Sequence, residues 1–376
     1  MNPLGDVERL DWLQLIRTET VGPITFRRLL ARYGSARAAL DALPALSRKA
    51  GRKAALKLAA RGEIEDEIAC AEQIGARFIA AGEADYPEPL AALPDRPPVI
   101  TVRGRISLFD KAAIAVIGAR NASGVGRKLA RTFATGLGEA GVVVVSGLAR
   151  GIDGAAHAAA LETGTIAVVA GGVDAVYPPE HASLMEAIAE RGLIVSERPI
   201  GHQPTARDFP RRNRLISGLS RGILVVEAAA KSGTLITARF ALEQGREVFA
   251  APGSPLDPRC QGANRLIRDG AVLAQTADDI LDVLAAQTRG AGEDGRARPF
   301  DWNAAETDSA GEPDESALAD LRAQVLELLG YTPLHRDELF REIDAPAGYL
   351  ADALLDLVLS GEAEEHPGGR FSRAAG

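Results

Sequence analysis

The strongest structural signal in this chain begins at residue 114 and reads Ile114-Ala115-Val116-Ile117-Gly118. More short runs of the same kind follow it, each rich in β-branched or other apolar residues: Val142–Ser146, Thr165–Val169, Leu193–Ser196, Gly222–Val226 and Glu247–Ala250. Near-continuous apolar runs of this length are typical of strands that are buried on both faces of a sheet. Residues 114–250 are therefore expected to contain a series of buried strands.

Helical patterns separate several of these strands. Apolar residues recur at helical spacing over Val125–Ala140, Ala182–Arg191 and Leu235–Gln244. Strands that alternate with helices are joined by right-handed crossovers, and they form a parallel sheet with helices on both faces. The sequence thus predicts an α/β fold whose core is an extended, Rossmann-like, doubly wound sheet.

The segment before this core has a different pattern. Residues 7–80 show apolar spacings of three and four, which predict helices, and adjacent prolines in Leu93–Pro98 mark a boundary. The stretch Val21–Leu30 is similar to a helix–hairpin–helix element, whose glycine turn can offer backbone N–H groups to a phosphate. A Gly/Pro turn between two packed helices is an equally good interpretation. A small all-α domain is predicted for residues 1–84.

The segment after the core is acidic. Residues 290–316 are rich in Gly, Ala, Pro and acidic residues, which predicts a flexible acidic linker. Residues 317–376 show three helical patterns and a short ribbon, which is the order of a winged helix. The third of these helices, Ala347–Ser360, carries Asp352 and Asp356 but no Lys or Arg. This favours a structural or protein-contacting role over the reading of duplex DNA.

The net charge of −8 over 376 residues is unevenly distributed along the chain. Residues 1–110 carry a net +1 and residues 111–289 a net +3, whereas residues 290–316 and 317–376 carry −6 each. A local basic site in the sheet domain is therefore compatible with an acidic whole. One hypothesis is that the acidic last quarter inhibits such a site.

Several classes of protein are disfavoured by the composition. Cys70 and Cys260 make no disulfide framework or metal motif, and no apolar run is long enough to span a bilayer. Residues 1–6 have neither the basic nor the apolar region of a secretion signal. We expect a cytoplasmic protein that uses no metal, no other cofactor and no membrane.

The loops at the carboxyl ends of the strands carry the chemistry of a doubly wound fold, because ligands bind there. The loop from Gly118 to Gly126 combines small residues, the charged fork of Arg120 and a following helix N-terminus, and these features suit an anion. A tight strand–helix turn without a ligand is the alternative. The next strand ends in Ser146 and Gly147, another turn that lets a backbone approach.

Asp153 and His157 follow that turn on one face of a predicted helix. They have the spacing of an acid–base pair, but no Ser or Cys nucleophile is evident beside them. We therefore expect a structural hydrogen bond between the two side chains.

The densest cluster precedes the fifth strand and reads Phe209-Pro210-Arg211-Arg212-Asn213-Arg214. Arginine forks suit phosphate, and a phenylalanine can stack on a base, although a charge run is often only a solvated face. After the same strand, Lys231, Ser232 and Thr234 can donate to an anion at the next helix N-terminus. No carboxylate pair, metal set or nucleophile–base pair is visible in these loops. The pattern predicts a phosphate-binding crevice and no enzyme.

Several of these motifs together resemble the DNA-processing protein A family, also called DprA or Smf. The match covers roughly residues 85–285 and consists of Gly118-Ala119-Arg120, Ser146 to His157, Phe209 to Arg214, Ser232-Gly233-Thr234 and Pro252-Gly253. The resemblance implies a Rossmann-like DNA-binding domain over residues 85–289, a SAM-like or helix–hairpin–helix domain before it and a winged-helix domain after it. It also implies a homodimer that binds single-stranded DNA, protects incoming strands in natural transformation and loads the RecA recombinase onto them.

The same resemblance assigns roles to particular residues. Arg120 and the Arg211–Arg214 cluster would contact the DNA backbone, Gly118 would permit close approach, and Phe209 would stack. The candidate DNA-binding residues are Gly118, Arg120, Ser146, Gly147, Phe209, Arg211, Arg212, Asn213, Arg214, Lys231, Ser232 and Thr234.

Three other functions compete with this interpretation. A nucleotide phosphoribohydrolase of the LOG-like family would need a P-G-G-x-G-T motif with catalytic glutamates, whereas Gly233-Thr234 is followed here by Leu235-Ile236-Thr237. A dinucleotide-dependent oxidoreductase would need an acid at the end of the second strand, where Ser146-Gly147 stands. A pure interaction scaffold would not need the arginine cluster.

Overall fold

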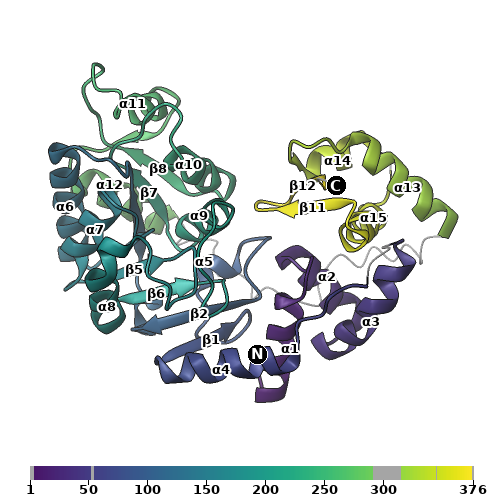
Figure 1. Cartoon of the computed structure of the whole chain (residues 1–376). Helices are drawn as coiled ribbons and strands as arrows, with labels where there is room; N and C mark the ends of the chain where they lie inside the picture. Colours follow the sequence, from purple (N-terminus) through teal and green to yellow (C-terminus); the bar gives the residue numbers. More distant parts are fainter. Residues whose placement is uncertain (1–3, 52–54, 291–314, 344, 375–376) are drawn as a thin grey trace. The chain divides into compact units, whose positions relative to one another are not determined.

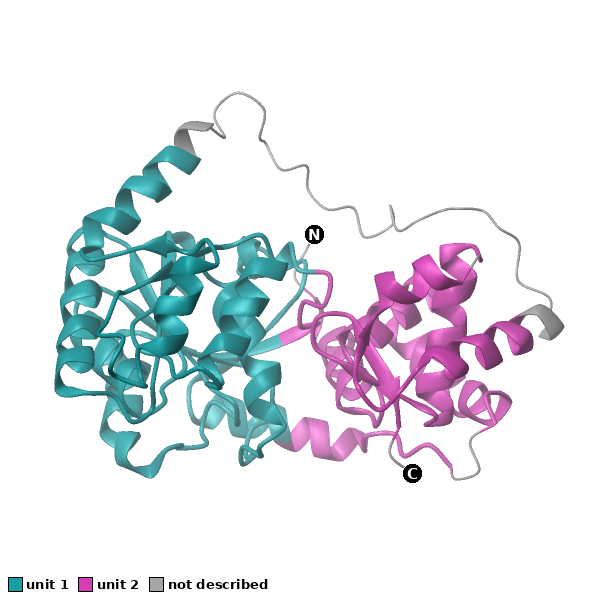
Figure 2. Ribbon diagram, turned by 90° about the horizontal axis from the view of Figure 1, so that it is seen from above, with its two compact units in different colours: residues 1, 67–93, 100–296 teal, residues 2–66, 94–99, 297–376 magenta. Residues whose placement is uncertain are grey.

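The computed structural model describes residues 4–51, 55–290, 315–343 and 345–374, so the predicted linker at 290–316 lies almost wholly outside the described residues. The chain divides into two compact units (Figure 2). Unit 1 comprises residues 67–93 and 100–296 together with residue 1, and unit 2 comprises residues 2–66, 94–99 and 297–376. Each unit is thus assembled from separate stretches of the sequence.

Unit 1 is built on a nine-stranded sheet with the order β1-β2-β6-β5-β4-β3-β7-β8-β9. Neighbouring strands from β6 to β9 in this order are parallel, whereas β2 pairs with β6 in the antiparallel sense. The strands are β1 (Ala76–Ala80), β2 (Val99–Gly104), β3 (Ala113–Ile117), β4 (Val143–Ser146), β5 (Thr165–Val168), β6 (Leu193–Ser196), β7 (Gly222–Val225), β8 (Glu247–Ala250) and β9 (Val272–Leu273). The predicted strands β3 to β8 are confirmed.

Strands β1, β2 and β9 were not expected from the sequence, and the first two belong to one end of the sheet. Residues 76–80 were predicted to be helical, but they form β1, and β2 follows directly after the Pro97-Pro98 boundary. Both strands lie at one end of the sheet, where β2 adds antiparallel to β6. Their short apolar runs lack the strand–helix alternation that made the parallel core recognisable.

The helices of unit 1 cover both faces of the sheet (Figure 1). Helices α6 (Gly124–Glu139), α7 (Ile152–Ala160), α8 (Ala182–Arg191) and α12 (Ala277–Gly290) lie on one side, and α9 (Asp208–Gly218) and α10 (Thr234–Glu243) lie on the other. A continuous core of Ile114, Val144, Phe133, Ile152 and Phe249 with their neighbours fills the first layer. The helix boundaries for α6, α8 and α10 agree with the predicted ones to within a residue.

The chain reverses its direction of winding at β3. The segment from β3 through β6 adds strands on one side of β3, and β7 then returns to pair with its other side. This reversal is the topological switch point, where ligands of doubly wound folds bind beyond the carboxyl ends of the strands. The loops after β3, β4, β5 and β7 therefore meet where a site is expected.

Unit 2 contains helices from both ends of the chain. Helices α1 (Asp6–Arg17), α2 (Pro23–Tyr33) and α3 (Ala36–Lys49) form its amino-terminal part. Its carboxyl-terminal part is a winged helix with its own core of leucines, valines and Phe371. This part comprises α13 (Glu315–Leu328), β10 (Leu334–His335), α14 (Arg336–Glu342), α15 (Ala347–Ser360), β11 (Ala363–His366) and β12 (Arg370–Arg373). The predicted winged-helix order is confirmed.

Among the described residues, no helix is long and apolar enough to cross a membrane. The described residues also contain no group of three His, Cys, Asp or Glu side chains that could hold a metal ion.

Candidate functional site

The loop after β3 does not present the open anion site that its glycines suggested. The first turn of α6 is occupied by the carboxylate of Glu227, which accepts hydrogen bonds from the Ser123 backbone N–H (3.0 Å) and hydroxyl (2.6 Å). Ser123 also caps the helix by accepting from Gly126 N–H at 2.8 Å. Because Glu227 is only 4% exposed, this helix N-terminus is filled from inside the protein.

Gly118 has a packing role in the same loop. A Cβ atom at this position would lie 2.5 Å from Ile152 Cγ1 on α7 and 3.1 Å from the Glu227 carbonyl oxygen. The carbonyl of Gly118 accepts a hydrogen bond from the Thr234 hydroxyl at 3.1 Å, which joins the loops after β3 and β7. The structure therefore explains Gly118 by the approach of α7, and close approach of DNA at this residue stays a prediction.

The loop after β4 is held by two buried side chains of α7. The Asp153 carboxylate accepts from the backbone N–H groups of Gly147 (3.1 Å) and Ala149 (3.4 Å), and His157 Nε2 accepts from Leu148 N–H (3.3 Å). The other ring nitrogen of His157 lies 2.7 Å from the Thr165 hydroxyl. The expected hydrogen bond between Asp153 and His157 is therefore wrong, since each side chain binds the loop and its surroundings instead of the other.

The electrostatics of these two side chains follow from their burial. Burial lowers the pKa of His157 to about 3, so the ring is neutral at pH 7. Burial also raises the pKa of Asp153, against the opposing effect of the Arg212 guanidinium and the two backbone hydrogen bonds. Ser146, at the end of β4, is fully buried and donates to the Val116 carbonyl at 2.6 Å.

The arginine cluster lies on α9, and two of its members are inside the protein. Arg212 is 5% exposed and donates to the carbonyl oxygens of Gly147 and Val168. Arg214 is 3% exposed and forms an ion pair with Glu197. Arg211 and Asn213 on the same helix are partly exposed. The cluster is therefore divided into residues that hold the fold and residues that reach solvent.

An exposed stack of side chains lies at the start of the same helix. The Arg120 guanidinium lies over the Phe209 ring, 5.0 Å from its centroid, and the Tyr177 ring lies 5.3 Å from that of Phe209 at an angle of 56°. Arg120 is exposed and Tyr177 is 43% exposed. The sequence reasoning found Arg120 and Phe209 but missed Tyr177, whose only signal was an aromatic residue in the loop after β5.

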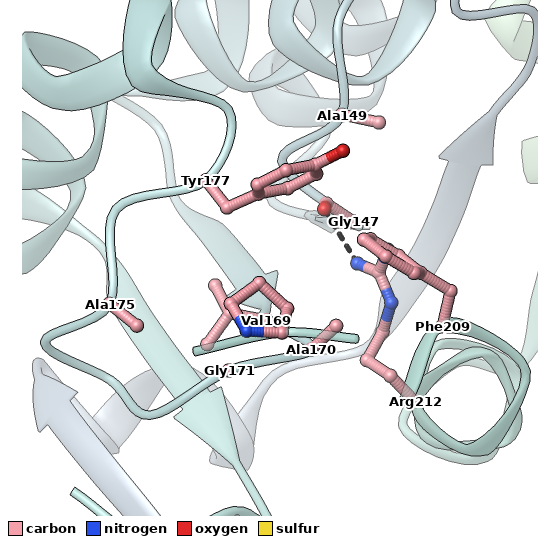
Figure 3. A pocket seen from close by; sticks show the side chains of 10 residues that line it. Gly147, Ala149, Val169, Ala170, Gly171, Ala175, Tyr177, Phe209 and Arg212 are labelled. Atoms are coloured by element: carbon pink, nitrogen blue, oxygen red, sulfur yellow. Dashed lines mark hydrogen bonds between the residues drawn. The ribbon is translucent and has the colours of Figure 1, made fainter. Parts of the chain in front are cut away.

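A pocket opens beside this stack (Figure 3). It contains about 300 Å³ of empty space, part of it open solvent. Figure 3 shows Arg212 pointing from α9 toward the Gly147 loop, with the Tyr177 and Phe209 rings close by. The lining residues are Gly147, Ala149, Val169, Ala170, Gly171, Ala175, Tyr177, Pro204, Phe209 and Arg212.

Arg212 gives this pocket a polar feature. Its Nε–H is buried and has no hydrogen-bond partner among the described residues, whereas its Nη1 donates to two carbonyl oxygens. Burial lowers the pKa of Arg212 to about 10, so the guanidinium remains charged at pH 7. A buried donor without a partner carries a desolvation cost of about 1–3 kcal/mol.

The loop after β7 contributes the remaining candidates. Lys231 is exposed, whereas Ser232 and Thr234 are partly buried and bonded to each other, with 3.0 Å between their hydroxyl oxygens. Thr234 N–H also donates to the Ser232 hydroxyl at 3.2 Å, so the first turn of α10 is satisfied locally. Among the predicted site residues, Arg120 and Lys231 are thus exposed, and six others are partly exposed: Gly118, Phe209, Arg211, Asn213, Ser232 and Thr234.

The fold and this site together define a class of Rossmann-like protein. In this class the helix N-terminus that would hold a nucleotide phosphate is filled by the protein's own carboxylate, here that of Glu227. The accessible crevice beside it carries cations and aromatic rings. Comparison with known proteins gives the family. Residues 77–285 match the family of DNA recombination-mediator protein A, residues 6–70 match the DprA-like N-terminal HHH domain, and residues 309–369 match the DprA winged helix domain. The chain belongs to the DNA-processing protein A (DprA/Smf) family.

Its relatives cover much of the chain. It is 38% identical to protein Smf of Escherichia coli over 84% of this chain and 82% of that protein, and 44% identical to DNA processing protein DprA of Streptococcus pneumoniae over 52% and 70%. The solved structure of the S. pneumoniae protein superposes with a TM-score of 0.61 at 32% identity, covering 74% of this chain and 98% of that one. The structure of the Helicobacter pylori protein, which concerns its single-stranded DNA binding mode, has a TM-score of 0.52 at 28% identity and covers 56% and 97%.

Proposed function

We propose that this chain binds single-stranded DNA in the crevice of unit 1. The observation that carries the proposal is the solvent-facing stack of Arg120, Phe209 and Tyr177 beside a pocket that Arg212 lines. Single strands expose the faces and edges of their bases, whereas a duplex stacks the faces and pairs the edges. Aromatic rings and arginine planes bind such exposed faces in a sequence-tolerant way.

The proposed roles differ among the candidate residues. Arg120 and Lys231 bind phosphates from their exposed positions, and Phe209 with Tyr177 stacks on a base. Arg212 lines the pocket beside these rings and holds the Gly147 loop. Gly147, Ser146 and Arg214 position these groups from the interior, and Gly118, Arg211, Asn213, Ser232 and Thr234 remain proposed contacts.

The family supports a role in recombination. The family name describes a recombination mediator, and a member from Helicobacter pylori has a described single-stranded DNA binding mode. We propose that this chain, as a cytoplasmic homodimer without an enzymatic reaction of its own, protects incoming strands and loads the RecA recombinase onto them. RecA-dependent strand exchange on DNA coated with single-strand-binding protein tests the loading step, and no stimulation by this chain would contradict it.

The binding step is tested by fluorescence anisotropy with a labelled poly-dT strand and a matched duplex. We expect preference for the single strand and at least a tenfold loss of affinity in Arg120→Glu. The matched control is Arg131→Glu, which makes the same charge change at an exposed position on α6. Equal losses in the two variants would indicate a diffuse charge effect, and unchanged binding in Arg120→Glu would move the site away from the crevice.

A second pair of variants separates stacking from charge. Phe209→Leu keeps an apolar side chain but removes the ring, and we expect a loss of about 1–3 kcal/mol per stacked base. Phe209→Tyr keeps the ring and should retain the affinity. Equal affinity of the leucine and tyrosine variants would exclude stacking at this position.

A further inference from the structure

The amino-terminal turn of α2 in unit 2 receives a carboxylate from the winged helix. Glu365 on β11 accepts from Ile24 N–H at 3.2 Å and from Thr25 N–H at 3.3 Å and its hydroxyl at 2.9 Å. The N-cap residue, Gly22, supplies no side chain for these donors. Glu365 therefore serves the first turn of α2 from more than 300 residues away in the sequence.

The geometry of the turn is adapted to this approach. A Cβ atom on Gly22 would lie 2.8 Å from Glu365 Oε1 and 3.0 Å from its carboxyl carbon. Gly22 has φ −89° and ψ 178°, a conformation open to most residues, so the glycine is required by space and not by backbone strain. Pro23 begins the helix and leaves Ile24 and Thr25 as the first donors.

The winged helix also contacts the basic side of the same part of unit 2. Residues 17–49 contain seven Lys or Arg and two Asp or Glu, whereas α15 carries acids only. Asp352 on α15 lies 3.8 Å from Arg28 on α2. The carboxylate of Asp356 interacts electrostatically with Arg322, Arg32 and Lys49. The acidic third helix of the wing is thus matched to α2 and α3.

Further hydrogen bonds complete the interface. Ser47 on α3 donates to the Leu359 carbonyl at 3.4 Å, and Arg322 on α13 donates to the Ala50 carbonyl at 2.9 Å. The tip of the wing is held as well, because Gly368 N–H donates to the Asp95 carboxylate at 2.8 Å. The winged helix therefore covers the turn, the basic helix face and the segment beside them.

These contacts place a carboxylate and an acidic helix where a nucleic-acid backbone would find backbone donors and arginines. Helix N-termini with free N–H groups bind phosphate, and Arg28 lies one turn further along α2. We propose that residues 22–28 form a second phosphate-binding surface for DNA, that the winged helix covers it from within the chain, and that Glu365 occupies the position of a phosphate oxygen. DNA gains this surface only when the winged helix leaves it.

The test uses the full chain with the unit 1 crevice disabled by Arg120→Glu and Lys231→Glu. Adding Glu365→Ala removes the carboxylate, and we expect at least a tenfold gain in affinity for a labelled poly-dT strand together with faster hydrogen exchange at Ile24 and Thr25. Glu365→Gln keeps one acceptor oxygen and should leave the surface covered. Glu338→Ala, an exposed glutamate on α14, controls for the charge removed from the winged helix.

Two further variants make the result specific. Gly22→Ala in the Glu365→Ala background places a methyl group in the vacated position, so it should abolish the gain. Asp352→Ala loosens the cover from the other side and should give a smaller gain, which keeps the test open if Glu365→Ala fails to fold. Unchanged hydrogen exchange at Ile24 and Thr25 would contradict the claim that Glu365 covers the first turn of α2. Faster exchange without a gain in DNA affinity would contradict the claim that residues 22–28 bind phosphate. If the variant that carries only Arg120→Glu and Lys231→Glu binds poly-dT as tightly as the wild type, the result contradicts the proposed function of the unit 1 crevice. It does not contradict the proposed surface at residues 22–28.

Discussion

At the scale of single residues, the same chemical type serves opposite purposes in this protein. Arg120 and Arg212 are both arginines of the predicted site, but Arg120 is exposed over Phe209 and Arg212 is buried under the Gly147 loop. The sequence could identify the arginines but not their burial, because the burial depends on the packing of α9 against distant loops. Likewise Glu227 follows a predicted strand, and nothing in the sequence indicates that it accepts hydrogen bonds from Ser123 at the N-terminus of α6.

Arg212 is therefore expected to matter for stability before it matters for binding. Arg212→Ala removes the cation that opposes the burial of Asp153, and we expect a loss of about 3–5 kcal/mol in the free energy of unfolding. Urea denaturation followed by circular dichroism measures this. Adding Asp153→Asn should recover part of the loss, and an unaltered midpoint in Arg212→Ala would contradict the structural role.

The buried His157 gives the fold a predictable response to acid. Its folded pKa of about 3 lies below the ordinary value of 6.5, so the unfolded chain binds more protons between these values. The free energy of unfolding should then fall by up to about 1.4 kcal/mol for each pH unit below 6.5. His157→Gln should flatten this dependence in thermal melts recorded between pH 4 and 7. Parallel pH profiles for the variant and the wild type would show that other groups dominate.

At the scale of helices and strands, the sequence was most informative where local pattern and burial coincide. Strands β3 to β8 and helices α6, α8 and α15 were predicted closely, because strong periodicity is a local property. The helical spacing of residues 7–80 predicts a helix where β1 forms, and no pattern indicates β2, because each strand is short and owes its pairing to the edge of a sheet assembled elsewhere. The contact of Glu365 with α2 could not be predicted for the same reason, because it joins residues that are far apart in the sequence.

The contact between Glu365 and α2 should depend on pH. Burial and the nearby Asp95 carboxylate raise the pKa of Glu365, against the hydrogen bonds from Thr25 and Ile24 that lower it. The pKa of Glu365 is raised in the state in which this side chain contacts α2, so protonation of Glu365 favours the contact. The contact should therefore be strongest below about pH 4.5 and should weaken as the pH rises through the raised pKa. Protection factors at Ile24 and Thr25 should fall as the pH rises above the ordinary glutamate value of 4.5. Glu365→Gln should remove this trend, and a trend that survives in it would assign the effect to another group.

At the scale of the whole molecule, the net charge of −8 is the sum of a basic region and an acidic region. The basic excess belongs to residues 1–289 and the acidic excess to residues 290–376, so the global charge predicts little about DNA binding. Binding through a few exposed cations should still depend steeply on salt. For single strands, the slope of log affinity against log salt is about −0.7 per phosphate contact.

Arg120→Ala should therefore reduce the salt slope for poly-dT by about 0.7, because it removes one phosphate contact. Anisotropy titrations between about 50 and about 300 mM salt measure the slope. Phe209→Leu is the comparison, since it should lower the affinity without changing the slope. Identical slopes for Arg120→Ala and the wild type would mean that Arg120 does not contact a phosphate.

The carboxylate of Glu227 at the first turn of α6 has a consequence for selectivity among cellular anions. Dinucleotides and nucleoside triphosphates draw much of their affinity in Rossmann folds from a pyrophosphate at this turn, and here that position is occupied by a carboxylate side chain. Small nucleotides are thus denied their principal anchor, whereas a polymer can add many weak contacts along its length. We therefore expect the proposed DNA crevice to discriminate against small nucleotides in favour of long strands.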